Sequence, residues 1–449
     1  MKKIDVKRFN AFVSFTRHPV AETFLQEIEW YENNNSCIFA TIILDKIDKD
    51  FSVVILRRDE NKIFRCSNSK DSISTIEKAR QWMIDKIEEI EKSEEYIFIQ
   101  GDEKNKKKKD IFEILNNKNI SDDFIKLKEF EEYEPAKLLI SEIMPHYIDI
   151  DGNFIEQFQT TGFDSRIWEL YLFCYLNEEK FIIDKKYNAP DFYIHKGNCS
   201  VSIEATILGN KKEEKNDNIE ERIDNILPFR FGSAIKSKMD HLNKDKLHYW
   251  EYEHTKNLPF MIAIEDFSYE ISMTYSSTAL QHYLYGYSHS ILYDNKGNLK
   301  VIPKKIEYFK YKDKVIEAGF FLNKENENVS AILSSTSGTI SKFLRIGKQS
   351  GFDKYNKLCI TQQSLLYDPN PNASEPIYKE VEITEYSNEK WSDGISIYHN
   401  PNAKFPIDRH LFPNATHHFF KDGFIETISK PYSVISSITN ISKRGYYTL

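Results

Sequence analysis

The sequence predicts an α/β protein with a central mixed sheet, flanked by smaller α+β regions at the N- and C-terminal ends. In the middle of the chain, apolar strand-like runs alternate with segments whose apolar residues recur at helical spacing, a pattern typical of an α/β core. The 449 residues are 40% hydrophobic and 14% aromatic, enough to fill more than one core. We expect an N-terminal α+β domain at 1–130, a central domain at 131–312 and a C-terminal α+β region at 313–449.

The N-terminal domain combines a meander with one long helix. The stretch CIFATIILDKIDKDFSVVILRRDENKIFRCSN holds apolar runs separated by polar turns, which predicts antiparallel strands. The following stretch, SISTIEKARQWMIDKIEEIEK, has apolar residues at helical spacing and offers Ser72 and Ser74 as N-caps. We therefore expect an amphipathic helix packed on a small sheet.

The central domain opens with an apolar helix over 164–177 that contains Glu169. The stretch NAPDFYIHKGNCSVSIEAT, residues 188–206, reads as two strands joined by a turn around Gly197, which predicts a hairpin. GSAIKSKMDHLNKDKLHYW is expected to form a second helix, and the apolar run LPFMIAIEDF a buried strand of the sheet.

The C-terminal region contains SSTSGTISKFLRIGKQSG, residues 334–351, in which a Ser/Gly turn leads into a helix. Lys342, Arg345 and Lys348 recur every three residues and share one helical face, which could bind a phosphate backbone. An ordinary solvated basic face is an equally good interpretation. The phosphate-binding motif GxxxxGK[ST] is absent, which excludes a P-loop here.

Composition excludes several classes of protein. A net charge of −8 argues against a protein that coats nucleic acid through general basicity. The five scattered cysteines include no CxxC pair, which favours a reducing cytoplasm over a disulfide framework or structural zinc. No apolar run approaches the roughly 18 residues of a membrane span, and the charged N-terminus does not resemble a signal peptide.

Three carboxylates carry the strongest functional signal. Asp191 and Glu204 lie among apolar strand residues, where a buried charge is costly unless it is paired or binds a metal. The predicted hairpin can bring the two acids side by side, and Glu169 precedes them on the apolar helix. Taken singly, each acid is better interpreted as a turn cap, a solvent-facing strand residue or a surface helix residue. Together they suit a hard cation such as Mg²⁺.

The order of these residues resembles the PD-(D/E)XK, or restriction-endonuclease-like, nuclease superfamily over about residues 160–270. Glu169 matches the helix acid, Asp191 the aspartate of the PD pair, and Glu204 the (D/E) position. Thr206 stands where the family has its lysine. We expect Lys238, and next Lys236, to supply that charge from the helix opening with GSAIKSK. Much of the chain also resembles a group of bacterial proteins that brings no established activity with it.

The resemblance implies Mg²⁺-dependent hydrolysis of phosphodiester bonds, with Mn²⁺ as a substitute ion. Asp191 and Glu204 would bind the metal, Glu169 would be a further ligand or orient the metal-bound water, and Lys238 would act as the catalytic lysine. The expected substrate is nucleic acid, with DNA favoured, and superfamily analogy suggests defence against foreign DNA. A homodimer or a partner subunit fits this reading. The alternative is an inactive nucleic-acid-binding or scaffold protein, because Thr206 has no charge.

An aromatic segment, YWEYEHTKNLP, follows the second predicted helix. Its rings could stack on nucleic-acid bases. Core packing is the better interpretation from the sequence alone, because clustered aromatic residues most often fill a core.

Overall fold

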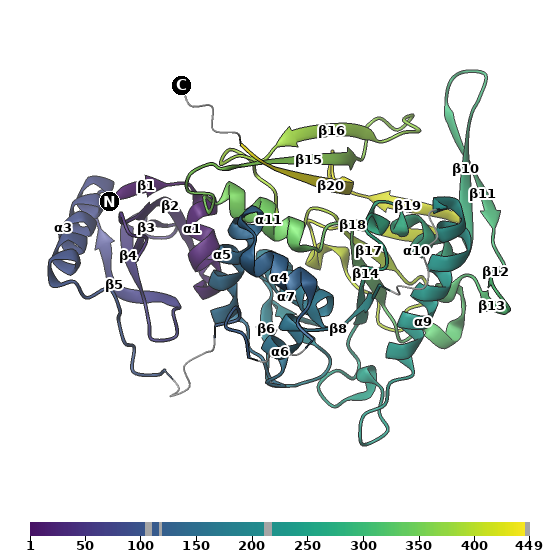
Figure 1. The fold of residues 1–449 in the computed structure, drawn as a ribbon, viewed down its shortest axis with the longest axis horizontal. Helices are drawn as coiled ribbons and strands as arrows, with labels where there is room; N and C mark the ends of the chain where they lie inside the picture. The colour runs from purple at the N-terminus through teal and green to yellow at the C-terminus, as the bar shows by residue number, and fades with distance from the viewer. Residues whose placement is uncertain (104–109, 116–118, 211–217, 445–449) are drawn as a thin grey trace.

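The computed structural model describes residues 1–103, 110–115, 119–210 and 218–444. Its centre is an eight-stranded mixed sheet of order β19-β18-β17-β14-β9-β8-β7-β6 (Figure 1). This confirms the predicted α/β class with a central mixed sheet. The strands of this sheet are β6 (Ile182–Asp184), β7 (Phe192–Lys196), β8 (Cys199–Leu208), β9 (Phe260–Asp266), β14 (Ala331–Ser335), β17 (Ile395–His399), β18 (Thr416–Lys421) and β19 (Phe424–Ile428).

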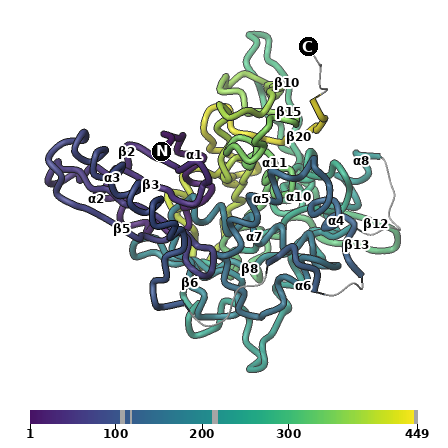
Figure 2. Tube along the Cα trace, turned by 60° about the vertical axis from the view of Figure 1, so that its left-hand side comes forward, coloured from purple at the N-terminus to yellow at the C-terminus, as the bar shows by residue number. Residues whose placement is uncertain are grey.

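The N-terminal unit is a five-stranded antiparallel sheet with a helix on one face, as predicted. Helix α3 starts after Thr75, whose hydroxyl accepts the Lys78 N–H, so neither Ser72 nor Ser74 is the N-cap. In Figure 2 this unit, in purple, lies at one side of the molecule. Its elements are β1 (Lys2–Ile4), α1 (Val6–Val13), α2 (Ala21–Phe24), β2 (Leu25–Glu32), β3 (Ile38–Asp45), β4 (Phe51–Arg58), β5 (Phe64–Ile73) and α3 (Ile76–Ser93).

Alternation along the strands splits the N-terminal apolar residues between two cores. Ile38, Ala40 and Ile42 of β3 face α3 and pack on Met83. Phe39, between them, faces the opposite side and packs on Phe9 and Phe12 of α1, with the Phe12 ring centroid 4.7 Å away. That second side merges with the core of the central sheet, which joins the N-terminal unit to the rest of the chain.

Helices cover the central sheet on both faces. On one face, helix α7 packs on β8 and β9 through residues such as Trp168 and Leu172. On the other face, α9 and α10 pack through Phe231 and Leu280. The helices of this part of the chain are α4 (Asp122–Glu129), α5 (Glu134–Ile143), α6 (Phe154–Gln159), α7 (Phe163–Glu178), α8 (Ile219–Glu221), α9 (Leu227–Met239), α10 (Ser276–Tyr285) and α11 (Ile340–Gln349).

The helix predicted over GSAIKSKMDHLNKDKLHYW is shifted toward the N-terminus. Helix α9 begins at Leu227 and ends at Met239. Beyond it, the Asn243 side chain accepts the backbone N–H groups of Asp245 and Leu247, which stabilises a turn in place of a further helical turn. After this turn the chain forms a short 3-10 helix, Tyr249–Glu251, which is separate from α9.

The central sheet does not end at the predicted boundary of 312. Strand β14 pairs in parallel with β9, and β17, β18 and β19 extend the sheet further. The residues after 312 thus complete the central core, because β9 needs a partner on its second edge. A separate three-stranded sheet is formed by β15 (Leu358–Leu366), β16 (Ile377–Glu382) and β20 (Val434–Lys443).

Two hairpins project beside α10 at one end of the molecule (Figure 1). They are β10 (Tyr287–Tyr293) with β11 (Leu299–Lys305), and β12 (Tyr308–Tyr311) with β13 (Lys314–Glu317). Neither pair of strands is hydrogen-bonded to the central sheet.

Helices α11 and α5 pack closely, and Gly347 makes this approach possible. A Cβ atom at Gly347 would overlap the carbonyl group of Pro135 in α5. The backbone of one helix therefore lies directly against the other at this point.

We expect Gly347→Ala to destabilise the protein by about 2 kcal/mol or more, although alanine normally favours a helix by about 1 kcal/mol. The measurement is the free energy of unfolding in urea. Gly209→Ala is the control, because a Cβ atom there meets nothing within 4 Å. Equal stability of the two variants would contradict the close approach.

Candidate active site

The β7–β8 hairpin brings Asp191 and Glu204 together. Phe192 pairs with Ile203 and Lys196 with Cys199, so Gly197 and Asn198 form the turn, and Gly197 has a left-handed φ of 60°. This register places Asp191 opposite Glu204. The Asp191 backbone N–H donates to Glu204 Oε2 at 3.3 Å, and the Ala205 N–H donates to Asp191 Oδ2 at 2.8 Å.

Glu169 approaches the same place from helix α7. The neighbouring Trp168 anchors this helix, because its buried indole N–H donates to the Ala263 carbonyl of β9 at 3.2 Å. Burial and then the negative charge of Asp191 raise the pKa of Glu169 to about 7. The structure therefore groups the three acids that the sequence singled out.

Glu169 is held by a cation and a phenol. The guanidinium of Arg166 donates to both carboxylate oxygens, at 2.8 and 2.6 Å, and the Tyr147 hydroxyl donates to Oε2 at 3.2 Å. Arg166 is one helical turn from Glu169 on α7, so the helix itself supplies the partner. Both contacts come from one nitrogen, Nη1, and this charge-assisted pairing orients the Glu169 carboxylate.

Glu204 has two donors of its own. Lys238 Nζ, from α9, donates to Oε1 at 2.7 Å, and the Tyr249 hydroxyl donates to the same oxygen at 2.8 Å. Burial and then the charge of Asp191 raise the pKa of Glu204 to about 7. Helix α9 thus delivers Lys238 to the acids, while Lys236, on the same helix, is exposed and pairs with Asp240 at 3.1 Å.

A second lysine, Lys185, lies beside the acids and was not predicted. Its Nζ donates to the Asp191 carbonyl at 2.9 Å and lies 4.5 Å from the centroid of the Phe192 ring. Burial lowers its pKa, against the opposing charges of Asp191 and Glu169. The one signal in the sequence is the pair Lys185 and Lys186 shortly before the PD dipeptide. It is weak, because the sequence does not show which of the two side chains is buried.

The donor set suits a metal ion bound by two carboxylates. Mg²⁺ is commonly held by one or two carboxylates together with water and substrate phosphate oxygens, and Asp191 and Glu204 supply such a pair. Within the described part of the chain, no group of three His, Cys, Asp or Glu side chains is arranged to hold a metal ion. Glu169 does not complete a three-carboxylate cage in this conformation, in keeping with its pairing to Arg166.

The predicted basic face of α11 is not a surface, and this corrects the expectation for Lys342, Arg345 and Lys348. Their exposed fractions are 0, 1 and 5%. Lys342 and Arg345 both pair with the buried Glu389, at 2.8 and 2.7 Å, and Lys348 pairs with Asp353 at 2.5 Å. Interior carboxylates compensate these cations, so the three residues stabilise the fold and do not present charge to a phosphate backbone.

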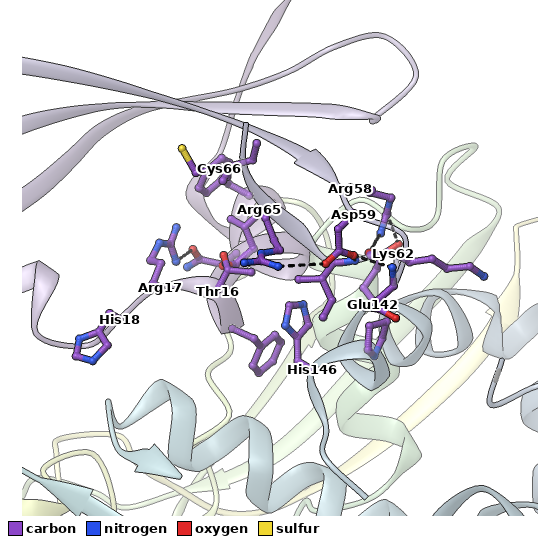
Figure 3. A pocket seen from close by; sticks show the side chains of 18 of the residues that line it. Thr16, Arg17, His18, Arg58, Asp59, Lys62, Arg65, Cys66, Glu142 and His146 are labelled. Carbon is purple, nitrogen blue, oxygen red and sulfur yellow. Dashed lines mark hydrogen bonds and ion pairs between the residues drawn. The ribbon is translucent and has the colours of Figure 1, made fainter. Parts of the chain in front are cut away.

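A cleft of about 1900 Å³ lies between the N-terminal sheet and the helices before α7 (Figure 3). Its lining includes Tyr147, which contacts Glu169 of the acid cluster. Carboxylates outnumber lysines and arginines along its walls. The arginines drawn in Figure 3 are paired: Arg17 with Glu27 at 2.6 Å, Arg58 with Glu142 at 2.8 Å, and Arg65 with Asp102 at 2.5 Å. Such walls would repel a phosphate backbone.

Comparisons with known proteins do not place the chain in a family. No family model, no curated protein and no solved structure matches it. In the part of the chain that the structure describes, no helix is long and apolar enough to span a membrane.

The raised pKa values of Glu169 and Glu204 predict that their contribution to the free energy of unfolding falls as pH rises from about 4.5 to about 7. Glu169 and Glu204 bind protons more tightly in the folded than in the unfolded protein, so deprotonation in this window costs stability. Asp191→Asn removes a shared cause of both shifts. We expect it to reduce the stability lost between pH 5 and 8 by roughly 1–3 kcal/mol.

Urea unfolding at several pH values measures this difference, with the exposed Asp240→Asn as the control. An unchanged pH dependence in Asp191→Asn would show that the charge of Asp191 does not act on the two glutamates.

Proposed function

We propose that the chain is a Mg²⁺-dependent nuclease that hydrolyses phosphodiester bonds. One observation carries this proposal: Glu169, Asp191 and Glu204, from one helix and one hairpin, lie together with Lys238 from a second helix. The acid order and the hairpin resemble the PD-(D/E)XK arrangement. Asp191 and Glu204 would hold the ion, which supplies an activated water and charge stabilisation at a phosphoryl oxygen.

The chain's own residues have separate roles in this scheme. Lys238 reaches Glu204 from α9 and replaces the positive charge that Thr206 cannot supply on β8. Its ammonium group would orient the attacking water and stabilise the negative charge that develops on the phosphate. Arg166 holds the carboxylate of Glu169 in place. Glu169 would then orient the metal-bound water beside Asp191.

DNA is the proposed substrate, cleaved internally by an endonuclease, and the proposed setting is a bacterial cytoplasm in which foreign DNA is degraded. These finer statements rest on superfamily analogy. They do not affect the residue roles given above.

A second candidate function is a nucleic-acid-binding or scaffold protein without catalysis. The specific observation in its favour is that Arg166 and Lys238 already compensate two of the three carboxylates. The cluster is thereby stabilised without a metal ion. Metal binding and cleavage separate the two functions.

We expect wild-type protein to cleave DNA or RNA only when Mg²⁺ or Mn²⁺ is added. Asp191→Ala and Glu204→Ala each abolish cleavage, because each removes one of two carboxylate ligands. Lys238→Met lowers the cleavage rate about 10²–10³-fold, the loss typical of removing one electrostatic group from a transition state. Lys236→Met is the matched control on the same helix and leaves the rate unchanged.

The measurement is cleavage of linear, supercoiled and single-stranded DNA and of RNA over a titration of each metal. Calorimetry with Mg²⁺ alone gives a second readout, in which Asp191→Ala binds no metal. Nucleic-acid binding by the wild type without cleavage under any metal would favour the second candidate function.

A further inference from the structure

A cluster of four aromatic rings lies next to the acids. The rings of Tyr187 and His254 are stacked, with centroids 3.7 Å apart and planes 3° from parallel. Tyr193 meets both edge-on, at 5.8 and 5.6 Å, and its ring also contacts His195 at 4.5 Å. We call Tyr187, Tyr193, His195 and His254 the aromatic platform.

The hairpin ties this platform to the acids. Phe192 and Ile194 of β7 face the buried core, so Tyr193 and His195 share the opposite face of the strand, and Asp191 directly precedes the strand. Tyr193 follows Asp191 by two residues, about 7 Å along the strand, which is about the length of two stacked nucleotides at ~3.4 Å each.

A hydrogen bond fixes the outer ring pair to the same segment. His254 has a ring nitrogen, Nε2, 3.0 Å from the carbonyl oxygen of Ala189. Ala189 is two residues before Asp191, so the stacked pair of Tyr187 and His254 cannot move far from the acids.

The platform is not part of the core. Tyr187 is 39% exposed, and Tyr193, His195 and His254 are half-buried. Tyr249 and Tyr252, from the aromatic segment that the sequence singled out, are buried in the core behind α9. The segment YWEYEHTKNLP thus divides: the predicted core packing is confirmed for its tyrosines, while His254 turns to the surface side.

Neither of two regions away from the acids, helix α11 and the large cleft, offers a surface for a phosphate backbone. The cations of α11 are buried, and the walls of the large cleft carry an excess of carboxylates. Next to the acids, aromatic faces offer a further kind of contact with nucleic acid. Stacking of a base on an aromatic side chain contributes about 1–3 kcal/mol and requires an unpaired base, because a duplex hides the faces of its bases.

We propose that the aromatic platform stacks an unpaired base next to the phosphodiester held at Asp191 and Glu204, so that the substrate is single-stranded nucleic acid. This inference rests on the proposed nuclease function for the identity of the neighbouring site. The stacking itself requires no cleavage, and its test therefore uses binding.

The test is fluorescence anisotropy with a labelled single-stranded DNA oligonucleotide, the same sequence as RNA, and the same sequence closed into a duplex hairpin. Binding is measured without divalent ions and again with Ca²⁺. Wild-type protein should bind either single strand at least ten-fold more tightly than the duplex. Preference for the DNA or the RNA strand identifies which polymer the site takes.

Tyr187→Ala should weaken single-strand binding roughly 5–100-fold, in line with the free energy of one stacked base, and leave duplex binding unchanged. Tyr187→Trp should retain the affinity, since it keeps an aromatic face. Tyr386→Ala is the control, because Tyr386 is 86% exposed and lies in the loop after β16. Far-UV circular dichroism checks that each variant is folded.

Three outcomes would each overturn the proposed stacking. The wild type could bind single strand and duplex equally, or bind neither, or Tyr187→Ala could bind the single strand as tightly as the wild type. These outcomes differ from failure of the proposed function. If wild type binds single strands through Tyr187 but never cleaves them, the nuclease proposal fails and the platform stands. If wild type cleaves and Tyr187→Ala binds equally well, only the platform fails.

Discussion

The fold depends on one strand that is almost completely shielded from solvent. All seven residues of β9 are buried, and the strand pairs in parallel with β8 on one edge and β14 on the other. Parallel pairing on both edges requires that helices cover both faces, and α7 on one side with α9 on the other does so. Because α7 is anchored to the β9 backbone through Trp168, this strand also sets where Glu169 lies.

The acid cluster depends on charge compensation. Three carboxylates lie together, and Asp191 raises the pKa of the other two. Specific side-chain donors fix the orientation of Glu169 and Glu204. Arg166 and Lys238 provide positive charge from two helices that cover opposite faces of the sheet. Under the proposed function, a divalent cation and a phosphate would therefore meet carboxylates that are already oriented.

Local patterns were enough to predict the hairpin, the apolar helix with Glu169 and the helix that carries Lys238, since each depends on spacing within a short segment. They were insufficient for Lys342, Arg345 and Lys348. A basic helical stripe has the same pattern whether it faces solvent or a buried Glu389, and that carboxylate is about 40 residues further along the chain. For the same reason the sequence did not show that the central sheet continues past residue 312, because β9 and β14 pair although they are far apart in the chain.

The sequence by itself determined the order of the three acids and Lys238 along the chain, and the helices and hairpin that carry them. The tertiary structure decided which cations reach the acids, namely Arg166, Lys185 and Lys238, and which are enclosed by interior carboxylates. It also decided that Tyr249 packs inward while Tyr187 stays at the surface beside Asp191. Burial and charge pairing depend on neighbours distant in the chain, and those neighbours are defined only when the sheet has assembled.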